Sequence, residues 1–414
     1  MTVFRGAVGI LALLLLAWLL SENRRGPALR VVFGGVALQL GLALALLKFP
    51  PATWVFLLLN RAVAALQAAT DAGTSFVFGY LGGGPLPFAE TRPEASFILG
   101  FRAFPLVLVI SALASLLFYL GILQKIVWVL AWTLRRTLGI GGALGLGACV
   151  HIFVGMVEAP LLVRPYLRSM ARGELFALMS CGMAGIAGTV MVIYASLLGP
   201  VIPDALGMIL IASIISTPAA LAVAAIMVPF APNLKEAGRL DIADPPSSMM
   251  EAIVRGANEG IGFLANIIAM LIVLVALVAL INMTLAFIPH ADDPLTLQRL
   301  FGFGFRPIVW LIGIPAAETE AAARLMGVKT ALNEFVAYVE LARLPQEALS
   351  PRSRLIMTFA LCGFANFGSL GIMIGGMSVM APERKREIAQ LGLRSIVSGT
   401  LATSMSGAVV GMIT

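Results

Sequence analysis

The stretch IGFLANIIAMLIVLVALVALINMTLAFI, residues 261–288, contains no charged side chain. A helix needs about 20 consecutive apolar residues to cross the hydrocarbon core of a bilayer, and this stretch exceeds that length. Similar runs recur along the chain, in which 60% of the 414 residues are hydrophobic and only 12% are charged. Soluble globular proteins carry roughly 25% charged residues. The composition therefore excludes an ordinary soluble enzyme and indicates an all-α polytopic membrane protein.

Eight apolar runs are long enough to form transmembrane helices. They cover residues 4–20, 31–48, 103–121, 175–199, 205–228, 261–288, 355–380 and 391–413. Two further stretches, 54–72 and 124–138, have apolar residues at helical spacing but also polar side chains, which predicts interfacial helices. We interpret the first run as a retained span, because Ser21 to Arg25 form no small-residue cleavage site for a signal peptide.

Basic residues between the spans predict the orientation of the chain. Clusters follow spans one, three, five and seven and precede span four; they contain Arg24, Arg25, Arg30, Lys125, Arg135, Arg136, Arg164, Arg168, Arg172, Lys235, Arg239, Arg384, Lys385 and Arg386. If both termini face outward, all of them lie inside, as the positive-inside rule favours. Arg343, Arg352 and Arg354 are the exception. Topology thus explains the net charge of +7 better than nucleic-acid binding does.

Two apolar stretches, 140–173 and 296–342, are too interrupted by glycine, proline and carboxylates to cross the membrane. Non-helical backbone at membrane depth is tolerated only inside protein or beside a watery cavity, so each is predicted to form a re-entrant hairpin. The segments Cys181–Gly188 (CGMAGIAG) and Cys362–Ser369 (CGFANFGS) also echo each other. A hairpin plus two spans would then occur twice, as inverted repeats with a site between them. Small residues also favour close packing of any membrane helices.

These features predict one membrane domain with four segments. Residues 1–139 form scaffold spans one to three with the interfacial helices, and residues 140–228 form the first hairpin with spans four and five. Residues 229–295 contribute scaffold span six, and residues 296–414 form the second hairpin with spans seven and eight.

Ionisable groups at membrane depth are costly and are retained mainly where they bind something. Glu158 and Glu334 are the strongest candidates, with paired structural carboxylates as the alternative. Asn366 and Ser369, one turn apart, would share a helix face and either bind a solute or bridge helices. Glu318 and Glu320 face either a hairpin break or water.

Few other residue types offer site chemistry. His151 either titrates near neutral pH or packs as a hydrogen-bonded histidine. His290 is the second of only two histidines. The cysteines, Cys149, Cys181 and Cys362, lie in apolar segments without metal-type spacing. The sequence therefore predicts no metal site and no cofactor.

Four segments in order resemble those of the concentrative nucleoside transporter family. The first is Gly155–Tyr166 (GMVEAPLLVRPY), which resembles the first-hairpin motif of that family. The others are Arg255–Gly260 (RGANEG), Met326–Tyr338 with its MGVK and NEFVAY parts, and Ala360–Phe367 (ALCGFANF). The eight spans and two hairpins resemble the bacterial form.

The resemblance implies a homotrimer in a bacterial inner membrane, in which each protomer moves a nucleoside and a cation by an elevator-like shift. It matches Glu334, Asn366 and Ser369 to ribose-binding positions. It matches Glu158 and Val190 to positions beside the base, and Phe364 to an aromatic wall. The family's polar pair before the hairpin glutamate is Met156 and Val157 here. The Gly155–Met156 pair resembles the purine-preferring members, so the resemblance implies a preference for purine nucleosides, while Val157 departs from those members and leaves a more apolar base pocket.

The cation site departs from the pattern of the sodium-coupled members. His151 stands where they have Asn, and Gly185 stands where they have Ser. Val154 and Ile186 match the remaining positions and offer only backbone carbonyls, whereas a hard cation needs several oxygens. We therefore expect proton coupling, with Glu158, Glu334 or His151 as the carrier, and keep sodium as the alternative.

Three other functions compete with a proton-coupled purine nucleoside importer. One is a sodium-coupled transporter of another nucleoside-like solute. The second is a membrane-embedded hydrolase that uses Glu158 and Glu334, although no activated nucleophile or metal set accompanies them. The third is a non-transporting nucleoside sensor, for which the sequence offers no signalling domain.

Overall fold

The computed structural model describes residues 2–48, 50–89, 98–153, 155–156, 158–231, 246–288 and 294–414. Every regular element within these ranges is a helix, so the all-α prediction is confirmed for them. Five of the described helices are long and apolar enough to cross a membrane. They are α2 (Leu29–Lys48), α4 with α5 (Leu99–Tyr119), α12 (Ala205–Met227), α13 (Met249–Leu285) and α19 (Lys385–Ile413) with the turn before it. The chain is a multi-pass membrane protein.

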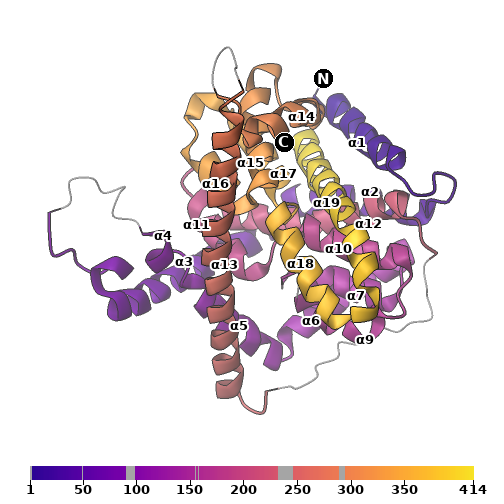
Figure 1. Cartoon of the computed structure of the whole chain (residues 1–414). Coiled ribbons are helices and arrows are strands. Elements are labelled where there is room, and N and C mark those ends of the chain that lie inside the picture. Colours follow the sequence, from indigo (N-terminus) through magenta and orange to yellow (C-terminus); the bar gives the residue numbers. More distant parts are fainter. Residues whose placement is uncertain are drawn as a thin grey trace.

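The two stretches predicted to be interfacial are both helical. They lie within α3 (Pro50–Phe78) and α6 (Ile122–Leu138). In Figure 1, α3 and α4 (Leu99–Arg102) project sideways from the bundle rather than along α13. The helices therefore form as predicted, and their position in the membrane interface remains a prediction.

The centre of the bundle is formed by α12 and α19, both of which are almost entirely buried. The half-helices α10 (Arg172–Ala184) and α17 (Pro351–Leu361) pack against α19. Small residues permit this close packing, because helices in lipid gain little from hiding apolar surface and depend on van der Waals contact. The stretch from Ala219 to Ala225 of α12 is completely buried.

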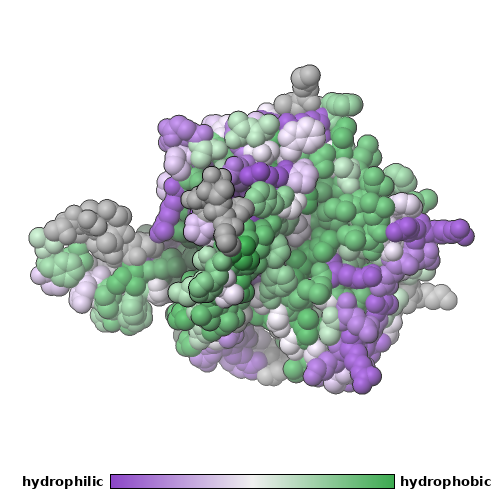
Figure 2. Space-filling view, turned by 45° about the horizontal axis from the view of Figure 1, so that its top comes forward, coloured by the Kyte–Doolittle hydropathy of each residue, from purple (hydrophilic) through white to green (hydrophobic). Residues whose placement is uncertain are grey.

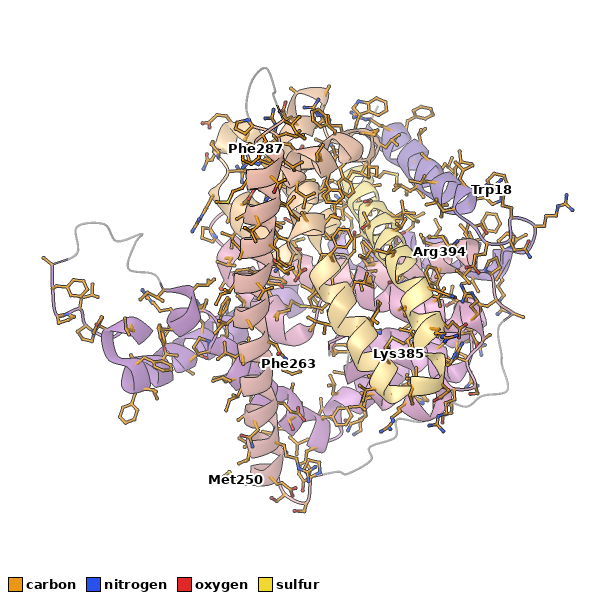
Figure 3. The ribbon with its side chains drawn as sticks, viewed as in Figure 1. Trp18, Met250, Phe263, Phe287, Lys385 and Arg394 are labelled. Atoms are coloured by element: carbon orange, nitrogen blue, oxygen red, sulfur yellow. The ribbon has the colours of Figure 1, made fainter. Side chains whose placement is uncertain are left out.

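Helix α13 lies on the outside of this bundle and packs along α5 (Leu106–Tyr119). It runs the height of the molecule, from Met250 at one end to Phe287 just beyond the other (Figures 1 and 3). Its outer side chains are apolar and exposed, among them Ile272, Leu280 and Met283. Figure 2 shows a broad hydrophobic surface with hydrophilic residues gathered toward its borders, as expected for a protein embedded in lipid.

A similar order of elements occurs twice in the chain, with one more short helix in the first series. The first series is α7 (Gly142–Val150), α8 (Glu158–Leu162), α9 (Arg164–Leu167), α10, α11 (Gly188–Leu198) and α12. The second is α15 (Thr319–Ala331), α16 (Glu334–Arg343), α17, α18 (Phe367–Met380) and α19. In Figure 1, α15 and α16 lie toward the end of the bundle that holds both chain termini, and α7 and α9 lie toward the opposite end. The two predicted hairpin regions thus lie toward opposite ends of the bundle, and their re-entrant path through the membrane stays a prediction.

The prediction of continuous spans at 175–199 and 355–380 is wrong. The first is divided between α10, which ends at Ala184, and α11, which begins at Gly188. The second is divided between α17, which ends at Leu361, and α18, which begins at Phe367. The apolar sequence cannot reveal such a break. The backbone N–H and C=O groups that the break leaves without helical partners bond to distant parts of the protein, which the local sequence does not show.

The predicted extent of the second hairpin, 296–342, is also wrong, because it includes a separate helix. Helix α14 (Leu297–Leu311) begins where the Thr296 hydroxyl accepts a hydrogen bond from the Arg299 backbone N–H. It ends before Gly313, whose φ of +110° requires glycine. The hairpin candidate is therefore α15 and α16 alone.

Two of the three arginines that break the charge pattern bind helix ends. Arg354 is buried and donates to the backbone carbonyls of Leu341, Leu344, Pro345 and Leu349. Arg352 donates to the carbonyls of Gly313 and Gly411. The last carbonyls of a helix lack intrahelical partners. These charges thus serve local structure, which explains why they depart from the orientation rule.

Candidate functional site

The two helix breaks lie against each other. The Phe364 backbone N–H donates to the Gly185 carbonyl across 3.2 Å. At Gly363 an added Cβ would lie 2.8 Å from the Met183 carbonyl oxygen, so this contact requires glycine. The two echoing segments of the sequence are therefore the breaks themselves, and they meet in the interior.

Glu334 is the central carboxylate of this region. Asn333 caps α16 through its side-chain oxygen, which accepts from the Val336 N–H at 2.9 Å, and Glu334 is the first helical residue. The Glu334 side chain is only 4% exposed. The Tyr194 hydroxyl donates to Oε1 at 2.7 Å, and Asn366 Nδ2 donates to Oε2 at 2.9 Å. The N-terminus of a helix also stabilises a negative charge.

Asn366 links Glu334 to the second break. It is completely buried and caps α18, with Oδ1 accepting from the Ser369 backbone N–H at 2.7 Å. The sequence predicts that Asn366 and Ser369 share a helix face. The structure instead joins them through the cap, which leaves the Asn366 amide nitrogen directed at Glu334. Ser369 is also buried.

Two functional candidates escaped the sequence reasoning. Tyr194 packs against Phe335 and Tyr338, with ring centroids 6.0 and 5.2 Å away, and bonds Glu334. Lys329 is completely buried five residues before Glu334. A buried tyrosine hydroxyl or ammonium normally has a specific partner, but the sequence does not show that either side chain is buried.

The first repeat contributes apolar side chains and a histidine. His151 lies at the end of α7, is 4% exposed and interacts with the backbone of Leu178. Within the described part of the chain its Nε2 atom has no hydrogen-bond partner. His151 and Met156 both pack at Gly182, where an added Cβ would lie 3.0 Å from His151 Cε1 and 3.4 Å from Met156 Cβ.

Gly185 has room for a side chain. An added Cβ would meet only the Cys181 carbonyl oxygen at 3.7 Å and the His151 carbonyl oxygen at 3.9 Å. Ile186 beside it is buried, and Val190 and Phe364 are partly buried against the core. A serine at position 185 would therefore fit and would stand close to the His151 carbonyl.

The remaining predicted residues either lie partly outside the described residues or lie away from the two breaks. Glu158 begins α8, but its side chain and the whole of Val154, Val157 and His290 lie outside the described residues. Glu318 accepts from the Ser350 hydroxyl and backbone N–H, both at 3.2 Å. Glu320 is 77% exposed and lies 3.3 Å from Arg306. Neither carboxylate therefore lies at the tip of α15 and α16.

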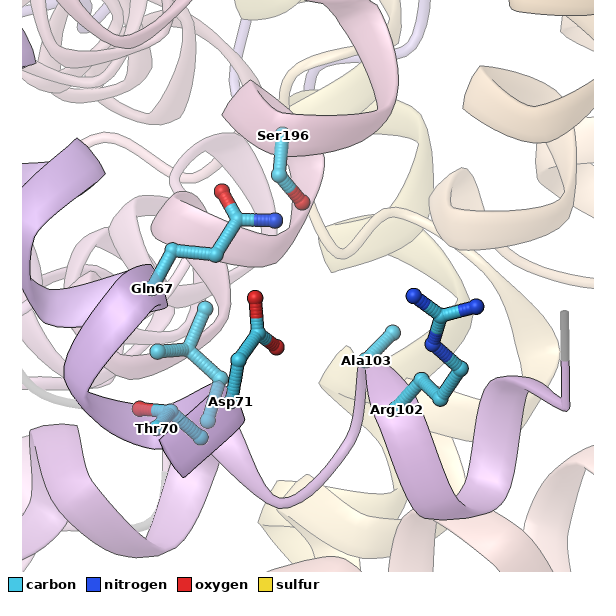
Figure 4. Close-up of a pocket in the computed structure, with 7 residues that line it drawn as sticks. Gln67, Thr70, Asp71, Arg102, Ala103 and Ser196 are labelled. Atoms are coloured by element: carbon cyan, nitrogen blue, oxygen red, sulfur yellow. The ribbon is translucent and has the colours of Figure 1, made fainter. Parts of the chain in front are cut away.

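A small polar pocket is lined by residues of α3, α4, α5 and α11 (Figure 4). It is lined by Gln67, Thr70, Asp71, Arg102, Ala103, Leu106 and Ser196. Its volume is about 60 Å³, and none of the predicted substrate-binding residues lines it. In the described ranges no three His, Cys, Asp or Glu residues gather closely enough to hold a metal ion.

Half-helices that meet around buried polar groups within a membrane are the construction of a secondary transporter. Comparison with known proteins agrees with this class. The family models described as the N-terminus and C-terminus of Na⁺-dependent nucleoside transporters match residues 8–81 and 208–411. A model described as nucleoside recognition matches residues 100–201.

Relatives match over nearly the whole chain. An uncharacterized transporter of Haemophilus influenzae is 38% identical over 100% of this chain and 98% of its own. The putative nucleoside permease NupX of Escherichia coli is 35% identical over 99% of each. Human solute carrier family 28 member 3 is 35% identical over 98% of this chain and 59% of its own.

Solved structures of the transporter CNTnw give the same result. The inward-facing, substrate-bound state has a TM-score of 0.88 at 34% identity, covering 100% of this chain and 98% of that one. An outward-facing variant has a TM-score of 0.90 at the same identity, covering 100% and 97%. The chain belongs to the concentrative nucleoside transporter family, which confirms the resemblance seen in the sequence. Since the named relatives are transporters, the hydrolase hypothesis is wrong.

Proposed function

We propose that the chain imports a nucleoside together with a cation across a bacterial inner membrane, and that Glu334, Asn366 and Ser369 bind the ribose. The observation that carries this proposal is the buried Glu334 carboxylate, which Asn366 and Tyr194 hold at the start of α16. Each carboxylate oxygen has lone-pair capacity beyond one bond, so it can also accept from a ribose hydroxyl. Charge-assisted bonds of this kind contribute ~1.5–3 kcal/mol each.

The base would lie on the side of the first repeat. Met156, Val157, Glu158 and Val190 would line it, with Phe364 as an aromatic wall. Met156 is apolar and packs beside the first break, which supports a preference for purine over pyrimidine nucleosides. An apolar wall accepts a large flat base, but it discriminates less sharply than hydrogen-bonding groups do.

We propose that the coupling ion is a proton. His151 and Gly185 provide no side-chain oxygen, so a sodium ion near the first break would depend on backbone carbonyls, such as those of Val154 and Ile186. Glu158, Glu334 and His151 are the candidate carriers. The matching family models carry the name Na⁺-dependent, which keeps sodium coupling, with a nucleoside or a similar solute, as the alternative.

The moving part would be the body that holds both helix breaks, and α5 with α13 would remain in a fixed scaffold. The exposed apolar residues of α13 fit contact with lipid or with two further copies in a homotrimer. In this assignment residues 1–139 and 229–295 supply the scaffold, and residues 140–228 and 296–414 supply the moving body.

Uptake of labelled adenosine into proteoliposomes tests the proposal. We expect accumulation with an inward proton gradient when choline replaces sodium, and loss of accumulation when a protonophore is added. Uptake that needs sodium and survives the protonophore would reverse the ion assignment. No uptake of adenosine or uridine under any gradient would overturn nucleoside transport itself.

A further inference from the structure

The second break lacks a helical hydrogen bond whose two partners are both bound elsewhere. In a continuous helix the Phe364 N–H would donate to the Ala360 carbonyl, four residues earlier. Here the Phe364 N–H donates instead to the Gly185 carbonyl of the first break, at 3.2 Å. The Ala360 carbonyl accepts from Lys329 Nζ at 2.9 Å. A side-chain cation thus occupies the acceptor through which α17 would otherwise continue.

Lys329 joins three helices at this point. It lies in the last turn of α15, is completely buried, and donates a second bond to Thr403 Oγ1 on α19 at 3.1 Å. The Thr403 hydroxyl in turn donates to the Thr400 carbonyl at 3.2 Å. Thr403 also packs behind the break, because a Cβ added at Gly363 would lie 2.9 Å from its methyl carbon. The lysine therefore connects α15 and α19 to the end of α17.

The local sequence does not impose the break. Residues 355–380 are a continuous apolar run, which is compatible with one unbroken helix. A buried carbonyl needs a partner, so an unoccupied Ala360 carbonyl would favour the helical bond to the Phe364 N–H. An ammonium competes well for that carbonyl, because a charge-assisted hydrogen bond is about twice as strong as a neutral one. The partners that Gly185 and Lys329 supply thus keep α17 and α18 separate.

Two proposed substrate-binding residues lie in the segment that this arrangement fixes. Phe364 contributes the displaced N–H, and Asn366 begins α18 as its cap. The Asn366 backbone N–H donates to the Phe364 carbonyl at 2.8 Å. A bond between residues two apart belongs to a γ-turn and not to a helix. The orientation of both side chains therefore depends on the break.

We propose that Lys329 is a positioning residue, which maintains the second break by binding the Ala360 carbonyl and thereby presents Phe364 and Asn366 to the nucleoside. This inference rests on the substrate-binding roles proposed above for these two residues.

Lys329→Met tests the inference, because methionine is similarly long but donates no hydrogen bond. We expect the affinity of the purified protein for labelled adenosine to fall at least about tenfold, as for the loss of one hydrogen bond to a charged group. Thr330→Val is the matched control and should bind as wild type does, since this neighbouring buried hydroxyl bonds to the Met326 carbonyl of its own helix.

Lys329→Arg and Lys329→Gln each keep an N–H donor for Ala360. At least one of them should bind adenosine more tightly than Lys329→Met does, because a donor at this position is what maintains the break. If both fold and neither binds better, the inference fails.

Cys362 reports on the break itself. Its thiol is completely buried, 3.6 Å from Ser213 Oγ and 3.7 Å from the Ile209 carbonyl oxygen. Alkylation by N-ethylmaleimide, followed by mass spectrometry of each cysteine peptide, measures its accessibility. In Lys329→Met the Cys362 rate should rise at least about tenfold, in step with the affinity, while the rate at the buried Cys149 of α7 stays unchanged. A lysine that only stabilises the fold would raise both rates together, through global unfolding.

The outcomes separate this inference from the proposed function. Wild-type affinity in folded Lys329→Met, or equal rises at Cys362 and Cys149, would overturn the inference. Asn366→Ala is measured beside it. If that variant binds adenosine normally, the ribose assignment fails instead, and the two alkylation rates alone decide the role of Lys329.

A second variant covers the case in which Lys329→Met does not fold. Thr403→Val keeps the ammonium but removes one of its two acceptors, and should raise the Cys362 rate above that in Thr330→Val. Equal Cys362 rates in these two variants would then overturn the inference.

Discussion

The two repeats follow a similar order of helices but hold their polar groups in different ways. Around the second break, Glu334, Asn366 and Lys329 all bond to other protein groups. Around the first, the described part of the chain offers His151 Nε2 no partner, and Gly185 leaves space beside the His151 carbonyl. The comparison teaches that protein partners hold the polar side chains at the second break, whereas the buried imidazole at the first break keeps one nitrogen without a partner among the described residues.

The largest expected effect is on adenosine binding, when the polar side chains near the second break are replaced. Glu334→Gln and Asn366→Ala should each abolish detectable adenosine binding. Glu334→Gln removes charge-assisted bonds to ribose hydroxyls worth ~1.5–3 kcal/mol each, and Asn366→Ala removes a neutral bond worth ~0.5–1.5 kcal/mol together with the amide that holds Glu334. Calorimetry measures the affinity, and size-exclusion chromatography with thermal melting shows whether the protein stays folded. Near-normal affinity in both folded variants would end the ribose assignment.

A second prediction concerns the first repeat and the choice of coupling ion. His151→Asn with Gly185→Ser should introduce sodium-stimulated uptake, because the serine has room and both side chains offer oxygen ligands. Adenosine uptake into proteoliposomes, with sodium or choline outside, measures the change against wild type. If the folded double variant still follows only the proton gradient, two side chains do not determine the choice of ion.

A smaller expected effect concerns which nucleoside base the protein prefers. Met156→Gln with Val157→Thr should raise the ratio of uridine to adenosine uptake, because hydrogen-bonding groups discriminate between bases better than an apolar wall does. Competition uptake with both labelled nucleosides gives the ratio directly. An unchanged ratio would show that these two positions do not select the base.

The smallest effect is at the surface of the first repeat, where Arg172 begins α10. Glu22 lies 2.9 Å from Arg172 and 2.9 Å from Arg394. The hydrogen bond from Arg172 holds the pKa of the Glu22 carboxyl below its usual range. The stabilisation is therefore complete above the ordinary pKa of glutamate and is lost as the pH falls through the lowered one.

Glu22→Gln should accordingly lower stability at neutral pH by less than ~1 kcal/mol, as is typical of partly exposed ion pairs. Thermal melting of wild type and variant in the same detergent, at neutral and at acid pH, measures the difference. A gap that widens in acid would contradict the assigned sign.

The sequence predicts the class of protein, the helices at residues 54–72 and 124–138, and the polar side chains that meet near the second break. Long apolar runs and rare buried polar groups are strong signals, and Glu334 and Asn366 stand out for that reason. The breaks themselves could not be predicted, since glycines such as Gly185 and Gly363 are also frequent in continuous transmembrane helices. Only the contact between the two breaks shows why they form.

Tyr194 and Lys329 could not be assigned from the sequence because their roles depend on distant partners. Tyr194 is one aromatic residue in an apolar run, and its bond joins α11 to Glu334, far along the chain. Lys329 lies within a stretch that the family resemblance includes, but its contacts to Ala360 and Thr403 depend on tertiary packing. Residue spacing along the chain carries no information on either contact.

The four carbonyls that Arg354 binds have a mechanical consequence. Three of them belong to the end of α16 and the residues after it, and Arg354 itself lies on α17. Swinging α16 away from α17 at this base would strand a buried guanidinium and several carbonyls in an apolar interior. The base of α16 is thus fixed to α17. Any bending of α16 relative to α15 would therefore be confined to the opposite, capped end, between Leu332 and Asn333.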